Sequence, residues 1–538
     1  MVEGLAVKLI MLVAFFAVMI FVGFYCRKHS TDVNGFVLGG RNVGPWLTAF
    51  AYGTSYFSAV IFVGYAGQFG WKFGIASTWI GIGNAVIGSL LAWVILGRRT
   101  RIMTQALQSA TMPDYFSKRY FSPSLKVAAA IVIFIFMIPY TASLYNGLSR
   151  LFKMAFGLDY SVCVIVMAVL TAVYVIAGGY MATAINDFIQ GIIMLFGIVA
   201  VIVAVLSLNG GLMGSMKGLA EINVTDPEIP KDAGNIKGIF SSFFGPDPLS
   251  LLGVVILTSL GTWGLPQMIG KFYAIKNEGS IHKGTIISTF FAIVVAGGCY
   301  FLGGFGRLFF ENGAIKPEGG FDNVVPKMLE SALKSPVLMA IVIILVLSAS
   351  MSTLSSLVLT SSSTVTLDLL KGRVVKNMDE KKQLLVMRAL IVVFILISAV
   401  LAIIQYNSPE QFIAQAMGIS WGAMAGAFLA PFLYGLYWKR ATAGGCWASM
   451  IFSSVFMIID MLTNLKTSAG TQLLPWKLGF LQSPINAGAF CMIVGLILVP
   501  LVSLVTKAPA KADIDQLFTC YDRKITVRAK DSIEVSEE

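Results

Sequence analysis

Residues 348–366 carry a dense run of hydroxyl side chains inside an apolar segment. Helical spacing places Ala349, Ser352, Thr353 and Ser356 on one stripe, because neighbours on a helix face lie three and four residues apart. Hydroxyls and freed backbone carbonyls are neutral oxygen donors that can replace the hydration shell of a monovalent cation. No titratable group lies in this run, so the pattern favours a sodium site over a proton site. Close packing of a hydroxyl-rich helix is the alternative that the residues leave open.

An acidic residue, Asp187, opens an earlier apolar segment, the sixth predicted span, after Gly178, Gly179 and Asn186. A carboxylate in such a segment is costly and indicates a functional site by default. Asp is also favoured at helix starts, so a capping role is the alternative, and the two roles are compatible. For Asp460, in a different apolar segment, we favour an interfacial or helix-contact role.

Ten polar or aromatic side chains face the inferred middle of the apolar segments and could line a pocket for a polar solute. Taken singly, each is more often a packing residue than a ligand. They are Tyr56, Gln68, Asn84, Tyr140, Tyr145, Thr262, Trp263, Gln267, Gln415 and Trp421.

The composition of the chain indicates which solvent surrounds these residues. Of 538 residues, 57% are hydrophobic and only 12% are charged, whereas about a quarter are charged in soluble domains. A spanning helix needs about 20 apolar residues. Runs of that length predict an all-α polytopic membrane protein with about thirteen transmembrane helices. They are 4–26, 46–70, 75–97, 125–155, 158–179, 187–208, 248–270, 284–311, 336–368, 384–405, 411–438, 442–463 and 484–506.

The basic residues predict the orientation. With the N-terminus outside and the C-terminus in the cytoplasm, about two thirds of the 39 Lys and Arg residues, Lys271 among them, fall on the cytoplasmic side, as the positive-inside rule requires. We therefore expect a multi-pass protein of the plasma (cytoplasmic) membrane. The net charge of +12 lies in short loops and does not indicate a nucleic-acid partner.

Two predicted spans carry residues that favour an interrupted helix. The second holds Gly53 to Tyr56 in mid-membrane, followed by Ser58, and the seventh holds Gly261 to Gln267, including Pro266. Interrupted helices are tolerated in a bilayer only where they line protein or a cavity. Many transporters open each of two inverted halves with such a helix.

The breaks predict a division of the chain into two five-helix halves with a discontinuous first helix in each. The predicted parts are a peripheral first helix and loop (1–45), the first half of a transport core (46–208), an extracellular loop (209–247), the second half (248–438), peripheral helices (439–506) and a cytoplasmic tail (507–538).

Several motifs resemble those of the sodium:solute symporter family, and the likeness spans about residues 5–506. The family carries proline, pantothenate, sugars, sialic acids, monocarboxylates and iodide, and its members share the leucine-transporter-like inverted repeat. The motifs are the Gly39-Gly-Arg-Asn-Val-Gly-Pro45 run, Ala177-Gly-Gly179 with Asn186-Asp-Phe-Ile-Gln190, Gly264-Leu-Pro-Gln267 with Lys271-Phe272, and Ala349-Ser-Met-Ser-Thr-Leu-Ser355.

The resemblance implies the roles of particular residues. The family's sodium site would use the carbonyls of Thr54, Phe57 and Ala349 and the hydroxyls of Ser352 and Thr353. Some members hold a second sodium, and the matching residues here are Asp187, Ser352, Ser355 and Ser356. One or two sodium ions per cycle are both compatible with this match.

The resemblance does not assign the solute. Proline carriers tend to have an aromatic residue where this chain has Thr262 and an acidic residue where it has Tyr56. The amino acid, monocarboxylate, pantothenate, sugar and sialic acid classes therefore stay open.

We expect sodium-coupled symport of a small polar solute into the cell by alternating access. Its partners are that solute and the lipid bilayer, with Na⁺ as the co-transported ion. We expect no organic cofactor, no resident metal, no obligate protein partner and no enzyme activity, since the predicted spans hold no HExxH motif and no paired carboxylates. An uncoupled facilitator or channel of the same fold and a membrane solute sensor are the alternatives.

Overall fold

The computed structural model describes residues 2–29, 31–157, 159–222, 237–310, 320–333, 335–372, 374–406, 413–465 and 472–522. Within these ranges the regular structure is helical, apart from two isolated β-bridges. The all-α prediction is therefore confirmed.

The long apolar helices number ten in the described ranges, or eleven when the bent pair Pro248–Gly264 and Pro266–Ala274 counts as one span. The predicted number of thirteen is not confirmed by this count. The reason is that two continuous helical stretches each cover more than one predicted span. Val60–Ala106 includes the end of 46–70 and all of 75–97, and Tyr160–Ser207 includes most of 158–179 and 187–208.

The first half of the chain forms helices of very different lengths. They are α1 (Val2–Tyr25), α2 (Val33–Leu38), α3 (Pro45–Tyr56), α4 (Ala66–Phe73), α5 (Thr78–Gly83), α6 (Arg98–Ala106), α7 (Met112–Arg119), α8 (Pro123–Phe156), α9 (Tyr160–Ser207) and α10 (Gly211–Glu221).

The second half contains the other long helices and several short ones. They are α12 (Pro248–Leu260), α13 (Pro266–Ala274), α14 (Glu278–Ala292), α15 (Gly298–Gly303), α16 (Val324–Ala332), α17 (Pro336–Thr364), α18 (Glu380–Tyr406), α19 (Ile413–Tyr437), α20 (Ala443–Asn464), α21 (Pro484–Val505) and α22 (Lys511–Phe518).

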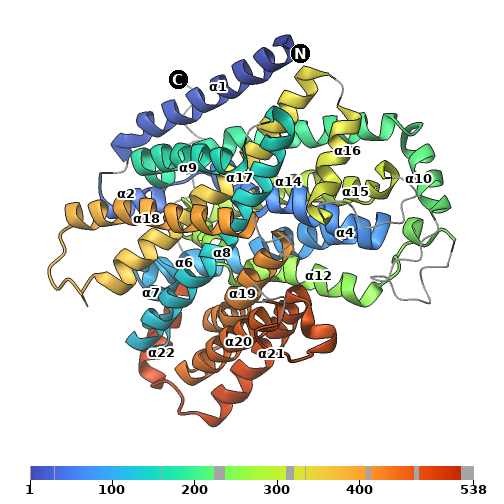
Figure 1. Ribbon diagram of the computed structural model, residues 1–538. Coiled ribbons are helices and arrows are strands. Elements are labelled where there is room, and N and C mark those ends of the chain that lie inside the picture. Colours follow the sequence, from blue (N-terminus) through green and yellow to red (C-terminus); the bar gives the residue numbers. More distant parts are fainter. Residues whose placement is uncertain are drawn as a thin grey trace, which may run out of the picture.

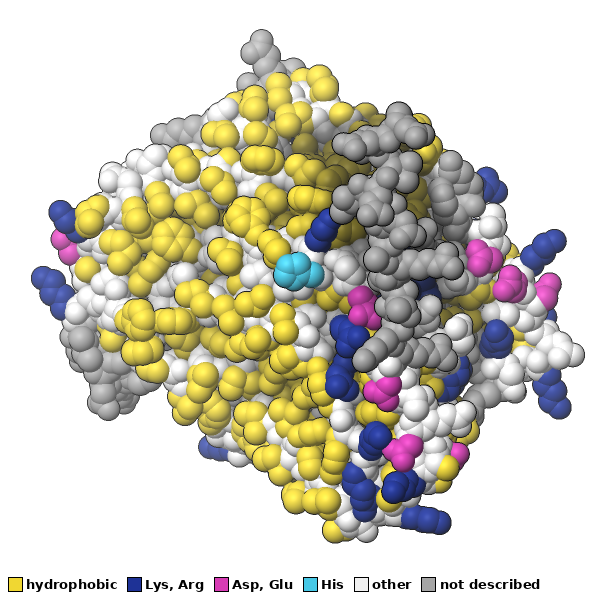
Figure 2. Space-filling model, turned by 180° about the vertical axis from the view of Figure 1, so that it is seen from behind, with side chains coloured by type: hydrophobic (Ala, Val, Ile, Leu, Met, Phe, Trp, Pro, Cys, Tyr) yellow, Lys and Arg dark blue, Asp and Glu magenta, His cyan; other side chains and the backbone are white. Residues whose placement is uncertain are grey.

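The bundle has a core with helices added at two opposite edges. Helix α1 lies along one edge and packs on α9 and α17, while α20 and α21 lie at the other edge and pack on α19 (Figure 1). In the middle, α9 and α17 contact each other, and both pack against α3 and α8. A broad hydrophobic surface covers one face, with charged side chains gathered toward its edges (Figure 2). Such a surface suits contact with lipid.

The first helix break follows α3. Its final residue is Tyr56, and Phe57 leaves the helical conformation (φ −99°, ψ 89°) before a π-helical segment, η3 (Val60–Tyr65), resumes the path. The predicted interruption of this span is therefore confirmed. The π-helical form leaves backbone groups out of the regular ladder and is common at functional sites.

The second break separates α12 and the 3₁₀ turn η8 (Gly261–Gly264) from α13. Leu265 is extended (φ −85°, ψ 121°), and the two pieces are bent by 45°. Pro266 explains the position of the break, because proline lacks an N–H and disfavours the helical conformation in the residue before it. This interruption was also predicted.

Helix α9 bends sharply at Gly179, where φ is +55°. A Cβ atom there would lie 2.7 Å from the Phe36 ring of α2, so both the backbone conformation and the close contact require glycine. The bend turns the second part of α9, which carries Asp187, into the core.

The predicted extracellular loop and tail are only partly described. Residues 223–236 and 523–538 lie outside the described residues. The loop contains α10, and the tail contains α22, where Ile514 and Phe518 are buried.

Candidate ion and solute sites

The first cluster of oxygens lies where α17 passes the end of α3. The hydroxyls of Ser352 and Thr353 donate to the carbonyl oxygen of Thr54 at 3.1 and 3.2 Å, and both also approach the carbonyl of Ala349 at 3.2 Å. Phe57 and Ala349 both line one small cavity. The structure therefore brings together all five residues of the predicted sodium set.

This first cluster is neutral and fully buried, since Thr54, Ser352 and Thr353 have no exposed side-chain surface. Its carbonyl and hydroxyl oxygens come from α3 and α17, which are far apart in the sequence. A sodium ion between them would take the hydroxyl lone pairs, while the hydroxyl hydrogens turn away. The break at Phe57 matters because it frees backbone carbonyls that a continuous helix would use internally.

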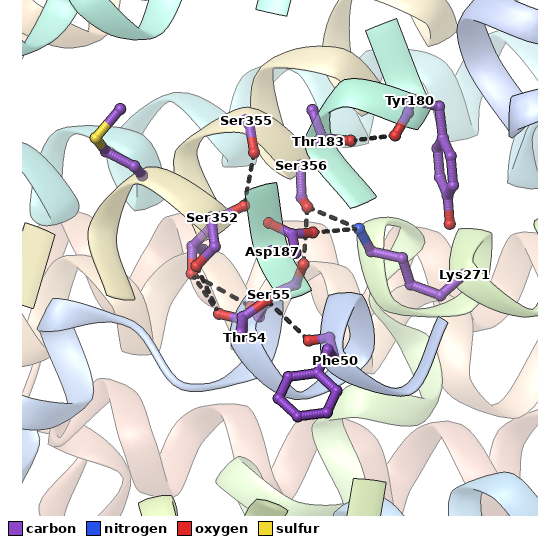
Figure 3. A network of polar contacts seen from close by, with 12 residues as sticks. Phe50, Thr54, Ser55, Tyr180, Thr183, Asp187, Lys271, Ser352, Ser355 and Ser356 are labelled. Carbon is purple, nitrogen blue, oxygen red and sulfur yellow. Dashed lines mark hydrogen bonds and ion pairs between the residues drawn. The ribbon is translucent and has the colours of Figure 1, made fainter. Parts of the chain in front are cut away.

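The second cluster contains full charges. The Lys271 ammonium donates to the Ser356 hydroxyl at 2.9 Å and lies 3.6 Å from a carboxylate oxygen of Asp187 (Figure 3). Ser356 in turn shares a hydrogen bond of 2.7 Å with Ser55. Ser55 directly follows Thr54, so the two clusters are joined through adjacent residues of α3.

The capping role considered for Asp187 is wrong. The residue lies in the interior of α9, well past the bend at Gly179, where it cannot cap a helix start. Its carboxylate is completely buried and receives no hydrogen bond from the described residues. A buried charge of this kind requires a counter-charge, which Lys271 supplies.

Of the three serines expected with Asp187 at a second sodium, only Ser356 contacts the Asp187–Lys271 pair. Ser356 contacts Lys271, whereas the Ser355 hydroxyl donates at 2.9 Å to the Ser352 carbonyl on its own helix. Ser352 itself belongs to the first cluster.

Six of the predicted solute residues gather beside the helix breaks. The Tyr56 ring stacks on Phe57 at 4.2 Å and lies 6.1 Å from Trp421, which is edge-on to Tyr140 at 6.0 Å. The hydroxyl of Tyr56 donates to the Thr258 carbonyl at 2.5 Å. Aromatic rings therefore form one wall of this region.

The other members of this group are tied to backbone or to each other. Asn84 accepts from the hydroxyl of Thr258 at 2.9 Å, Thr262 donates to the Gly88 carbonyl at 3.2 Å, and Trp263 donates to the Ile87 carbonyl at 3.0 Å. These contacts hold the second break against the π-helical segment η5 (Asn84–Leu91).

Three buried polar groups in the same region have no hydrogen-bond partner among the described residues. They are the Tyr140 hydroxyl, the Trp421 indole nitrogen and the Ser58 hydroxyl. The side chains of Trp421 and Ser58 lie close enough to the Tyr140 hydroxyl to interact with it. Buried polar groups are normally paired, so these groups are candidates to meet a polar ligand.

Four predicted solute residues lie elsewhere. Gln68 lines a cavity with Lys72 and Asn486 at one end of the bundle, and Gln267 lines another with Lys271 and Tyr180. Gln415 is half-buried near the start of α19, about two helical turns before Trp421. Tyr145 is buried in α8. Polarity within an apolar segment could not show their depth along each helix.

The sequence reasoning missed the role of Lys271. It counted this residue with the basic residues of a cytoplasmic segment, but the structure leaves only 3% of its surface exposed. The signal was its position, five residues after Pro266 in the helix that follows the break. Ser58, whose hydroxyl is unpaired, was noted only as part of the break.

These features are typical of a membrane transporter: a buried cluster of neutral oxygens and a central polar region lie beside two helix breaks. The comparisons agree with this class. The sodium:solute symporter family matches residues 36–453. The osmoregulated proline transporter OpuE of Bacillus subtilis is 29% identical over 502 residues, covering 93% of this chain and 94% of that protein.

Two further matches extend the likeness. Sodium/proline symporter 2 of Staphylococcus saprophyticus is 31% identical over 458 residues, covering 84% of this chain and 85% of that protein. The substrate-bound, outward-open structure of a Na⁺-coupled sialic acid symporter has a TM-score of 0.70 at 17% identity, covering 94% and 99% of the two chains. This confirms the leucine-transporter-like fold.

The chain belongs to the sodium:solute symporter family. It is therefore a multi-pass membrane transporter rather than an enzyme, and sodium is its co-transported ion.

Proposed function

We propose that this chain imports a small solute together with sodium, and that the sodium binds in the neutral cluster. Its ligands would be the carbonyls of Thr54, Phe57 and Ala349 and the hydroxyls of Ser352 and Thr353. The observation that carries the proposal is the meeting of both hydroxyls on the Thr54 carbonyl, directly before the break in α3.

A small solute with a carboxylate, and proline first, is the substrate we propose. The support is twofold. Two of the relatives are named as proline carriers, and three unpaired donors converge at Tyr140, Trp421 and Ser58. Hydroxyl and indole N–H groups suit carboxylate oxygens. The departures at Tyr56 and Thr262 make the details of recognition differ from those of typical proline carriers.

Two separate cavities support our proposal of alternating access. One cavity, lined by Gln68 and Lys72, lies toward one end of the bundle, and another, lined by Gln267 and Lys271, lies toward the other. Lys271 and Ser356 line the second of these cavities. The other residues of the ion clusters and the aromatic group around Trp421 line neither cavity. We place the N-terminus outside and the C-terminus in the cytoplasm, from the distribution of basic residues.

Uptake by purified protein in proteoliposomes tests this function. Tritium-labelled proline should accumulate under an inward sodium gradient and not under a matched potassium gradient. Unlabelled pantothenate, lactate, galactose and sialic acid added as competitors identify the solute class. If another solute, labelled in its turn, shows the sodium-driven uptake, that solute is the substrate in place of proline. Uptake that does not depend on sodium would contradict symport.

A further inference from the structure

Lys271 lies where a second cation would have to bind. Its ammonium is within 3.6 Å of the Asp187 carboxylate, donates to Ser356, and lies 5.3 Å from the Tyr180 ring (Figure 3). Through Ser356 it also reaches Ser55. These oxygens, one carboxylate and two hydroxyls, are the donors that a sodium ion at Asp187 would need.

The charge balance at Asp187 allows one cation. The carboxylate and the ammonium are both buried, with 0% and 3% of each residue exposed, so the pair is neutral as it stands. A sodium ion added beside Lys271 would leave a net positive charge in a region of low dielectric, which is costly. Lysine and sodium are therefore alternative partners of the same carboxylate.

The neutral cluster around Thr54 differs from the Asp187 site because no side-chain cation competes with sodium there. Its described contacts include no carboxylate and no basic side chain, only the carbonyl and hydroxyl oxygens around Thr54. Sodium entering there meets no tethered competitor. Sodium entering at Asp187 must first displace a side chain that is covalently part of α13.

We propose that Lys271 acts as a tethered cation that occupies the second ion site, so that this chain carries one sodium per cycle. The inference rests on the proposed function, because it takes sodium to bind at the neutral cluster. A tethered charge is not released with the solute. At 100 mV each transported charge contributes about 2.3 kcal/mol, which corresponds to roughly 50-fold accumulation for one sodium against about 2,000-fold for two.

Equilibrium binding of radiolabelled sodium to purified protein tests the proposal without knowledge of the solute. Wild type should bind one sodium per chain and Lys271→Met should bind two. The double variant Lys271→Met/Asp187→Asn should return to one, because both the competitor and the carboxylate are gone. Lys276→Met is the matched control, since this exposed lysine follows the same helix, and it should bind one.

The outcomes separate the inference from the function on which it rests. Two sodium ions bound to wild type, or one bound to folded Lys271→Met, would overturn the tethered-cation proposal. No sodium bound to wild type would instead contradict the neutral site itself. Lys271→Gln provides a polar substitute if the Met variant fails to fold. If neither variant folds, the wild-type stoichiometry decides: one site supports the proposal and two overturn it.

Discussion

The two polar clusters at the centre of the bundle lie one helical turn apart on α17 but balance charge in opposite ways. Around Ser352 and Thr353 every group is a neutral oxygen. Around Ser356 an ammonium and a carboxylate compensate each other. In our proposal a sodium ion completes the first cluster, whereas the second already contains its own cation, Lys271. Similar hydroxyl chemistry therefore has different functions according to which side chain faces it.

The largest effect is expected at the charged cluster. Asp187→Ala leaves the Lys271 ammonium buried without its carboxylate, and breaking a buried pair from one side costs about 3–5 kcal/mol. Thermal unfolding in detergent should show a marked loss of stability that added sodium does not repair. Lys271→Met/Asp187→Ala should recover most of it. A single variant as stable as wild type would show that the pair is not a buried charge balance.

Loss of the neutral oxygens should affect sodium rather than stability. Ser352→Ala/Thr353→Ala removes two hydroxyl ligands, and at about 1–1.5 kcal/mol each the sodium affinity should fall about 100-fold. The sodium concentration for half-maximal uptake measures this change. Ser350→Ala is the matched control, because its hydroxyl bonds to Val346 within the same helix. Equal effects of the control would remove the distinction between ligand and packing hydroxyls.

A smaller effect is expected in the solute region between the breaks. Tyr140→Phe removes an unpaired hydroxyl and keeps the ring beside Trp421. We expect the KM for proline to rise about tenfold, the value of one hydrogen bond to a charged group. Sodium affinity measured by binding without solute should stay unchanged. A change in sodium affinity alone would assign Tyr140 to the ion site.

The smallest effect is expected at an exposed ion pair, Asp515 and Lys439, which we compare with the buried pair of Asp187 and Lys271. Asp515 in α22 contacts Lys439 at 2.7 Å, and this hydrogen bond lowers the pKa of the Asp515 carboxyl. The stabilisation is therefore fully present above the ordinary carboxyl pKa of about 3.9 and is lost as the pH falls through the lowered pKa.

Solvent screening makes the contribution of that exposed pair small. Asp515→Asn should change the thermal midpoint only slightly at pH 7, and the difference from wild type should vanish in acid. A loss as large as that of Asp187→Ala would mean that burial does not distinguish the two pairs.

The sequence was sufficient for the features that depend on local chemistry. Pro266 and the Gly-rich run before it predicted a break because proline disrupts a helix wherever it occurs in the interior. The hydroxyl stripe of α17 followed from helical spacing alone. Both predictions are confirmed as structural features, while the binding of sodium to the stripe stays a proposal.

Features that depend on packing between distant segments could not be predicted in the same way. Lys271 was interpreted as a cytoplasmic charge because hydropathy does not show that Asp187, far away in sequence, compensates it. Asp187 was considered as a helix cap because a glycine bend and a helix start look alike in sequence. Gln415 was grouped with Trp421 on one helix, although its depth along α19 differs.

The most direct test of the account is sodium-driven uptake of labelled proline by wild type and Ser352→Ala/Thr353→Ala in the same proteoliposomes. The account predicts accumulation by wild type under an inward sodium gradient, loss of that accumulation in the variant at low sodium, and partial recovery at high sodium. Equal uptake by both proteins, with or without sodium, would contradict coupling through the oxygens around Thr54.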